Sequence, residues 1–180
     1  CHACGHTAAR SQLAHVVDLL YPTGAAPPTY DFATLLSASI LRETFFKGTC
    51  RQCHTRFSPH NTWRSVASTH ALPAVLCVNT CIDGAEQFHH WEPTDHGFVP
   101  LRLAMDVEHG YVHAQSLWDA SAPWPRAGTA CYMLRAMVIQ AQGARDAPHL
   151  CALVRAPNDD DAPDAWYVFN DFLVLSLIHI

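Results

Sequence analysis

The sequence has 180 residues, 49% hydrophobic and 15% charged, which suffices for one globular core but not for two domains of typical size. This composition excludes a disordered or collagen-like chain. Sixteen acidic and eleven basic residues leave a net charge of −5, so we expect no direct nucleic-acid footprint, because phosphates are bound by clustered cations. The sequence begins at Cys1 without a signal peptide, and its longest apolar stretch, residues 172–180, is too short to cross a membrane. We therefore expect a soluble protein, and a fragment whose true N-terminus lies upstream.

Two Cys-x-x-Cys motifs are the strongest chemical signal. They consist of Cys1 and Cys4 and, after a long insertion, of Cys50 and Cys53. Each motif holds two thiolates on one side of a tight turn, and two such turns complete a closed, tetrahedral structural zinc site. The alternative is a pair of disulfides or free surface thiols, although a disulfide within Cys-x-x-Cys is strained. The sequence leaves open whether an imidazole replaces one thiolate. The candidate imidazoles are those of His2, His6 and His54.

The other four cysteines all lie in apolar runs. Free cysteine behaves as a small buried hydrophobe, and a nucleophilic thiol needs an electropositive, partly exposed setting. We therefore expect core positions and no catalytic role for this set, which comprises Cys77, Cys81, Cys131 and Cys151.

The first half of the chain predicts a strand, a helix and a second strand. Residues 13–21 are β-branched in the middle, at Val16 and Val17, and stop at Pro22, which predicts a strand. Asp31 is a suitable N-cap for a helix over residues 32–43, where apolar side chains recur at helical spacing. The continuous apolar run of residues 72–79 predicts a central strand that is covered on both faces.

The second half predicts mainly strands. A polar surface connection, which includes His89 and His90, precedes a strand over residues 99–106 and a short element over residues 114–118. Three strand-like runs follow and favour an antiparallel meander, so that the expected fold class is α+β with a zinc-clipped β arm. These runs are residues 131–139, 149–155 and 166–169. His109 and His113 have the spacing of a helical metal-binding pair, but Gly110 argues against a helix there.

This order of elements resembles the fingers and palm of the ubiquitin-specific proteases. More closely, the chain resembles the inactive protease-like domain in the catalytic subunits of PAN poly(A)-specific nuclease complexes. The most specific stretch is Trp166-Tyr-Val-Phe-Asn-Asp-Phe-Leu-Val174, with further likeness in residues 17–22, 30–36 and 72–76. The resemblance implies an incomplete domain in which residues 1–70 form the zinc-finger arm and helix and residues 71–174 the palm. The tail, residues 175–180, does not match the family.

The resemblance also bears on catalysis. His149 stands where an active family member has its general base, and Asn170 where it has the residue that orients the base. Active members usually carry Gly-His-Tyr around the base, whereas here Pro148 and Leu150 flank His149. The main interpretation therefore assigns no catalytic residue to this chain. The alternative is an active thiol-dependent ubiquitin-specific protease that uses His149 and Asn170 with a nucleophilic cysteine upstream.

The function implied by the resemblance is that of a scaffold in messenger-RNA poly(A)-tail shortening, in the cytoplasm and in P-bodies. The chemistry would belong to a divalent-metal 3′–5′ exoribonuclease domain of the same polypeptide, which this sequence does not contain. The implied partners are that nuclease domain, a regulatory pseudokinase subunit and, indirectly, the poly(A) ribonucleoprotein. We expect the isolated 180 residues to be marginally stable, because apolar palm surface would be exposed.

Overall fold

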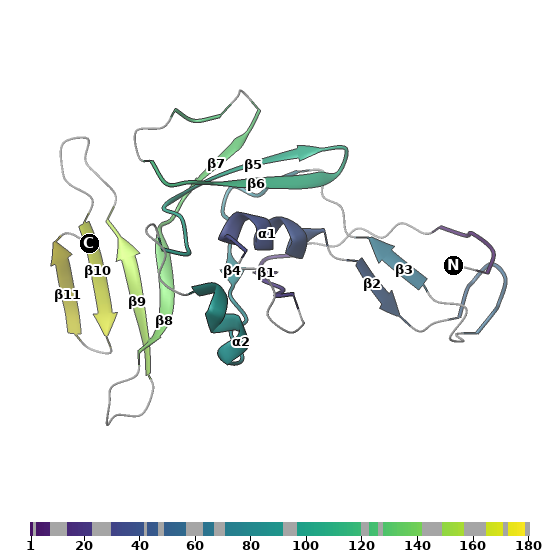
Figure 1. Ribbon diagram of the computed structural model, residues 1–180, viewed down its shortest axis with the longest axis horizontal. Coiled ribbons are helices and arrows are strands. Elements are labelled where there is room, and N and C mark those ends of the chain that lie inside the picture. The colour runs from purple at the N-terminus through teal and green to yellow at the C-terminus, as the bar shows by residue number, and fades with distance from the viewer. Residues whose placement is uncertain are drawn as a thin grey trace. The chain divides into compact units, whose positions relative to one another are not determined.

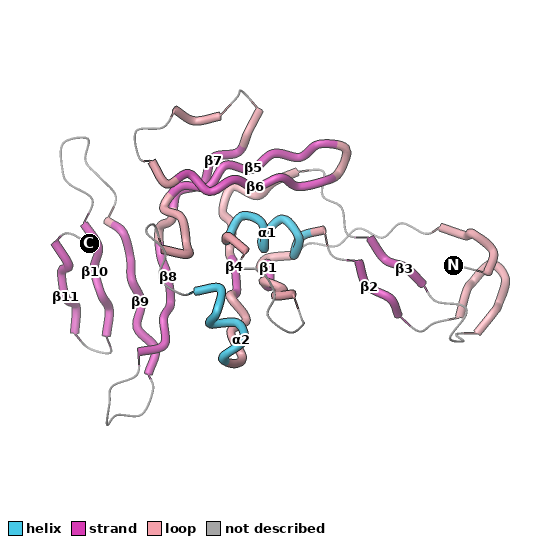
Figure 2. The backbone as a smooth tube through the Cα atoms, viewed as in Figure 1, coloured by secondary structure: helices cyan, strands magenta, loops and turns pink. Residues whose placement is uncertain are grey.

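The computed structural model describes residues 1, 3–7, 14–22, 30–41, 43–46, 49–56, 63–66, 71–91, 97–119, 123–125, 128–141, 149–156, 165–170 and 173–178. The chain divides into two compact units, Cys1–Tyr132 and Met133–Ile180. Figure 1 labels the helices and strands, and Figure 2 distinguishes them from the loops. None of the helices in the described ranges has the length and hydropathy of a membrane-spanning segment.

Helix α1 (Phe32–Ile40) provides much of the core of the first unit. The predicted N-cap is confirmed, because Oδ1 of Asp31 accepts a hydrogen bond of 3.1 Å from the N–H of Thr34. The helix ends three residues earlier than predicted. The next residues, Glu43–Phe46, form strand β2 instead, in keeping with the β-branched and aromatic residues of this segment.

Three groups of strands accompany α1 in the first unit. The short strands β1 (Val17–Asp18) and β4 (Val78–Asn79) pair in parallel. Strands β5 (Arg102–Glu108), β6 (Tyr111–Leu117) and β7 (Ala130–Met133) form a sheet in the order β6-β5-β7. Strand β2 pairs with β3 (Trp63–Val66) in an antiparallel arm, and the second Cys-x-x-Cys motif lies between these two strands in the chain.

The core of this unit lies between α1 and the β5–β6 pair, which Figure 1 shows alongside each other. Its buried apolar residues are Leu19, Phe32, Ala33, Leu35, Leu36, Phe98, Leu103, Met105 and Val112. Two serines of the helix join these layers through backbone groups. Ser37 Oγ accepts from the N–H of Ala114 at 3.0 Å, and the buried Ser39 Oγ accepts from the N–H of Leu20 at 2.8 Å. The helix therefore bonds to β6 on one side and to the segment that follows β1 on the other.

The second unit is a four-stranded antiparallel sheet, shown in Figure 2 as strands side by side. Its strands are β8 (Ala136–Ala141), β9 (His149–Arg155), β10 (Ala165–Asn170) and β11 (Leu173–Ile178). The order β11-β10-β9-β8 confirms the predicted meander. One face of the sheet carries the buried residues Cys151 and Trp166, while Val138 and Phe169 on the other face are exposed.

Three of the predicted strands are wrong in their extent. The described part of residues 13–21 forms only the two-residue β1, and the run of residues 72–79 forms only β4. The latter run bends at residues 74 and 75 and leaves Val75 74% exposed, so it is not a central strand. The run of residues 131–139 is divided between β7 and β8, which belong to different sheets.

Other predictions differ in detail. The predicted strand over residues 99–106 begins at Arg102 and continues to Glu108, and the short element over residues 114–118 is the end of β6. His109 and Gly110 form the turn between these strands, so His109 and His113 are not a helical pair. The connection predicted to lie on the surface contains helix α2 (Ala85–Phe88) and the short 3-10 helix η1 (His89–Trp91), and His90 is buried there.

Candidate metal centre

The structure brings the four cysteines of the two Cys-x-x-Cys motifs together. Their sulfur atoms all lie within 4.8 Å of one another. Two of the separations join the motifs crosswise, at 3.9 Å between the sulfurs of Cys1 and Cys53 and 3.7 Å between those of Cys4 and Cys50. The two motifs, far apart in the sequence, therefore form one cluster.

The sulfur separations fit a tetrahedral metal site. A zinc–sulfur bond of about 2.3 Å in a regular tetrahedron sets neighbouring sulfurs about 3.8 Å apart, whereas a disulfide needs about 2.05 Å. The observed 3.7 and 3.9 Å agree with the first value, and all eight cysteines are free thiols. The cluster can therefore hold a metal ion, and the alternative of disulfides does not describe this structure.

The two turns that present the sulfurs have the same backbone plan. In each turn the residue after the second cysteine donates its N–H to the carbonyl of the first, from Gly5 to Cys1 and from His54 to Cys50, both at 2.9 Å. Both donors have a positive φ, +69° for Gly5 and 56° for His54. This plan turns both thiols of a motif toward the same side, which is the physical meaning of the Cys-x-x-Cys spacing.

Neighbouring groups act on the thiols of the cluster. Oγ1 of Thr55 lies 3.2 Å from Sγ of Cys53, and the Thr55 hydroxyl and backbone N–H stabilise the thiolate, which lowers the pKa of Cys53 to about 6. The His6 backbone N–H lowers the pKa of Cys4, but burial and the sulfurs of Cys53 and Cys50 outweigh it, so that the net shift is upward. A metal ligand must be a thiolate, and Thr55 favours that state at Cys53.

The cluster consists of four thiols and contains no imidazole from the described residues. Of the three candidate histidines, His6 and His54 are described and are not members of the group, and His2 lies outside the described residues.

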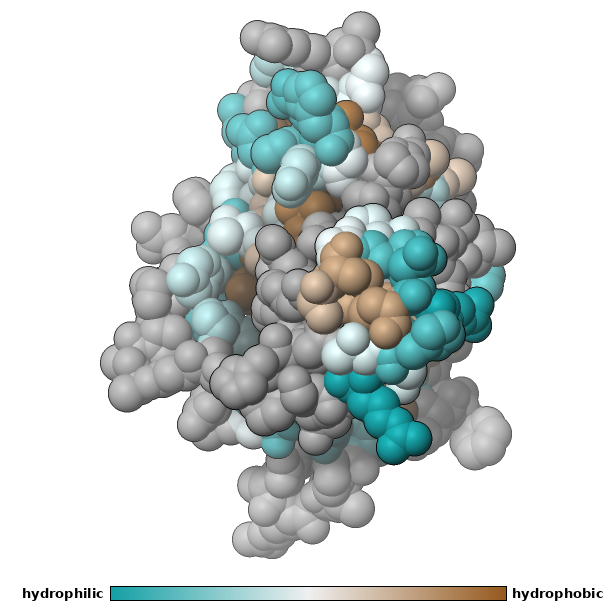
Figure 3. Space-filling view, turned by 90° about the vertical axis from the view of Figure 1, so that its right-hand side faces the viewer, coloured by the Kyte–Doolittle hydropathy of each residue, from teal (hydrophilic) through white to brown (hydrophobic). Residues whose placement is uncertain are grey.

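In the turns themselves Ala3, Cys4 and Arg51 are exposed. Figure 3, in which the right-hand side of Figure 1 faces the viewer, shows hydrophobic residues in separate patches beside hydrophilic ones. A structural metal contributes its binding free energy to folding, so we expect a bound metal to stabilise these turns.

The remaining four cysteines do not share one environment, and their common assignment to the core is wrong. Cys151 is buried as predicted, Cys81 is half-buried, and Cys77 and Cys131 are exposed. Strand alternation explains Cys131, because an apolar run on an outer strand still turns every second side chain outward. Burial and the carboxylates of Asp18 and Asp83 raise the pKa of Cys81, so its thiol is not activated.

His149 and Asn170 lie on neighbouring strands. His149 begins β9 and Asn170 ends β10, and the antiparallel pairing of the two strands ends at Phe169 with Ala152. His149 and Asn170 therefore lie toward the same end of the β9–β10 pair. Oδ1 of Asn170 is buried and has no hydrogen-bond partner among the described residues. The hydrogen bond that would orient a catalytic imidazole is not made.

Comparison with known proteins places these features in context. The family model for ubiquitin carboxyl-terminal hydrolases matches residues 1–174 of this chain. The chain is 31% identical over 189 residues to the PAN2-PAN3 deadenylation complex catalytic subunit PAN2 of Cryptococcus neoformans var. neoformans serotype D, and 25% identical to that of Schizosaccharomyces pombe. Both alignments cover 97% of this chain, but the chain spans only 14% and 16% of these relatives.

Solved structures show the same fold. The Neurospora crassa Pan2 catalytic unit, which contains a protease and a nuclease domain, superposes with a TM-score of 0.76 at 27% identity and covers 98% of this chain and 28% of its own. The Saccharomyces cerevisiae PAN2 pseudoubiquitin-hydrolase gives a TM-score of 0.69 at 15% identity over 97% of this chain and 47% of its own. These structures confirm the predicted α+β, protease-like fold. With the family model matching nearly the whole length, the chain belongs to the ubiquitin carboxyl-terminal hydrolase family.

Proposed function

We propose that this chain is the inactive hydrolase-like domain of a PAN2-type catalytic subunit and acts as a scaffold in poly(A)-tail shortening. The observation that carries the proposal is the 31% identity to a PAN2 catalytic subunit, which extends over 97% of the chain. The 27% identity to the Neurospora crassa Pan2 catalytic unit, at a TM-score of 0.76, supports the same assignment. Because the chain spans 14% of the curated relative, the activity of the whole protein forms part of the proposal.

The geometry around His149 supports an inactive domain. A thiol protease needs its imidazole held in one tautomer and orientation by an acceptor such as an Asn side chain. Here Asn170 Oδ1 accepts no hydrogen bond from a described residue, and the sequence around His149 departs from the pattern of active members. We assign no catalytic role to either residue.

The proposed partners follow from the same assignment. The nuclease domain of the same polypeptide would supply the divalent-metal chemistry of 3′–5′ RNA cleavage, and a regulatory pseudokinase subunit would bind the assembly. Contact with the poly(A) ribonucleoprotein would be indirect, because the net charge of −5 does not favour RNA phosphates. The proposed location is the cytoplasm, including P-bodies.

The function is tested with the full-length polypeptide that contains this chain. We expect it to shorten a poly(A) RNA from the 3′ end in the presence of Mg²⁺, and we expect no labelling by a ubiquitin probe that carries a thiol-reactive C-terminus. As a control, the double variant His149→Ala, Asn170→Ala should shorten RNA at the wild-type rate. Covalent labelling that is lost in this variant would instead establish the active ubiquitin protease, and absence of RNA shortening would remove the deadenylation assignment.

We further propose that the metal in the four-cysteine cluster is structural zinc. Zinc prefers tetrahedral thiolate ligands, and a site with four protein ligands leaves no open position for catalysis. The expected result is one zinc per chain in the purified wild type and none in the double variant Cys50→Ser, Cys53→Ser. The matched control is Cys77→Ser, which changes an exposed cysteine outside the cluster and should retain zinc. Stoichiometric zinc in the Cys50/Cys53 variant would overturn the assignment.

A further inference from the structure

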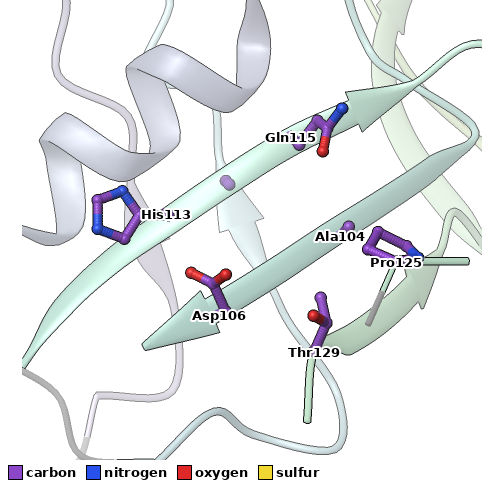
Figure 4. Close-up of a pocket in the computed structure, with 7 residues that line it drawn as sticks. Ala104, Asp106, His113, Gln115, Pro125 and Thr129 are labelled. Carbon is purple, nitrogen blue, oxygen red and sulfur yellow. The ribbon is translucent and has the colours of Figure 1, made fainter. Parts of the chain in front are cut away.

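The outward face of the β5–β6 pair contains a small hollow, shown in Figure 4. Its volume is about 100 Å³. The residues that line it are Ala104, Asp106, His113, Ala114, Gln115, Pro125 and Thr129. Pockets for complete small-molecule ligands usually measure about 300–1,000 Å³, so this hollow has room only for the end of a single side chain.

The strand register creates the hollow. Ala104 pairs with Gln115 and Asp106 pairs with His113, while the alternate residues Leu103, Met105 and Val112 of the two strands belong to the buried core. Ala104 is buried and small, so it leaves space that larger neighbours surround. Figure 4 shows Asp106 and His113 on adjacent strands, with Thr129 on the far side of β5 from His113.

The polar groups around the hollow can each accept a hydrogen bond, and those of Gln115, Thr129 and His113 can also donate one. They include the Asp106 carboxylate, the Gln115 carboxamide oxygen and the Thr129 hydroxyl, and Asp106 forms no ion pair with any described residue. Arg102 lies on the same face two residues before Ala104, but its position is fixed elsewhere. Its guanidinium lies 3.9 Å from the ring centroid of Trp124, and Nη1 donates to the carbonyl of Asp119 at 3.1 Å. The charge of Asp106 is thus left without a described counter-ion.

We propose that this hollow binds the guanidinium group of an arginine from a partner protein. A planar guanidinium can donate to a carboxylate through two parallel N–H bonds and still reach a second acceptor, which an ammonium group cannot do with the same geometry. Asp106 supplies the carboxylate, Gln115 and Thr129 supply further acceptors, and Pro125 offers an apolar edge to the arginine stem. This proposal concerns a binding site and holds whether or not the chain acts in poly(A)-tail shortening.

The test uses the full-length polypeptide, labelled with ¹³C in its alanine methyl groups, and the probe N-acetyl-arginine amide. We expect a saturable shift of the Ala104 methyl signal in NMR titrations. The uncharged isostere N-acetyl-citrulline amide should bind at least about tenfold more weakly, because it lacks the charge-assisted bonds.

Two variants remove the same charge from the same strand. Asp106→Asn should weaken binding of the arginine probe at least about tenfold, whereas Glu108→Gln, which lies two residues further along β5 and outside the hollow, should leave it within about twofold. Both side chains are exposed, so neither change should disturb folding, which unchanged methyl spectra would verify. Equal weakening in both variants would show general charge attraction instead. Equal binding of the citrulline probe, or unchanged binding by Asp106→Asn, would also overturn the proposal.

Discussion

The residue that follows each Cys-x-x-Cys motif makes the same backbone hydrogen bond, but it is a glycine in the first motif and a histidine in the second. Gly5 reaches the left-handed region without strain, but His54 reaches it at a cost of about 1–2 kcal/mol, because its Cβ crowds the backbone. His54 is exposed and does not belong to the cluster of sulfurs. It therefore contributes its backbone N–H to the turn, and its imidazole is not a metal ligand.

Exchanging residues at these two positions tests this role. His54→Gly should retain one metal per chain and change the free energy of unfolding by less than about 1 kcal/mol, because the relief of strain offsets the greater entropy of glycine in the unfolded chain. Gly5→Ala should destabilise the turn by about 1 kcal/mol or more; a Cβ there meets no atom within 4 Å, so the strain is purely conformational. Metal content and chelator competition measure both effects. Loss of metal in His54→Gly would make His54 a ligand after all.

The side chain of Ser39 forms two hydrogen bonds with backbone groups of other residues. Its Oγ donates to the carbonyl of Leu35 at 2.6 Å and accepts from the N–H of Leu20 at 2.8 Å, in a buried position. Ser39→Ala leaves the Leu20 N–H without this partner and should cost about 1–3 kcal/mol. Hydrogen exchange of the Leu20 amide in the full-length protein should accelerate accordingly. Ser37→Ala is the control, and it should lower the free energy of unfolding by less, because Ser37 is only half-buried. Equal protection of the Leu20 amide in the wild type and in Ser39→Ala would contradict the argument.

At the scale of elements, the hairpin between β5 and β6 depends on its turn. Glu108 pairs with Tyr111, and the two residues between them have positive φ values, 54° for His109 and 83° for Gly110. Such two-residue turns favour Asn-Gly. His109→Asn should therefore raise the stability of the hairpin by a few tenths of a kcal/mol, and Gly110→Ala should lower it by about 1 kcal/mol. Thermal melting of both variants measures the difference, and a more stable Gly110→Ala would show that the turn has another conformation.

The elements also show which features a sequence can reveal. Turn-forming residues border the apolar run of residues 149–155, and β9 has the predicted bounds. The runs of residues 72–79 and 131–139 are equally apolar, but a run without periodicity does not show where the chain bends or changes sheet. The sulfur cluster was predictable because each half is a local motif. The hollow at Asp106 was not, because its residues come from three segments and its floor depends on the register of β5 and β6.

At the scale of the whole molecule, the metal cluster and the meander belong to different units. The four cysteines of the metal cluster lie in the unit Cys1–Tyr132, whereas strands β8 to β11 lie in the unit Met133–Ile180. Each strand of the meander pairs with its neighbours through its own backbone, without a group from the cluster. Removing the metal should therefore destabilise the unit Cys1–Tyr132 before the unit Met133–Ile180.

Chelation tests this independence. A structural metal contributes its binding free energy to folding, so removal of the metal by 1,10-phenanthroline should unfold the turns. Hydrogen exchange in the full-length protein should then rise by more than about tenfold in residues 49–56, while residues 150–155 keep their protection. The Cys50→Ser, Cys53→Ser variant should show the same pattern without chelator, and Cys77→Ser should respond to chelator as the wild type does. Simultaneous loss of protection in residues 49–56 and 150–155 would show that the two units unfold as one, because only a shared cooperative transition exposes both together.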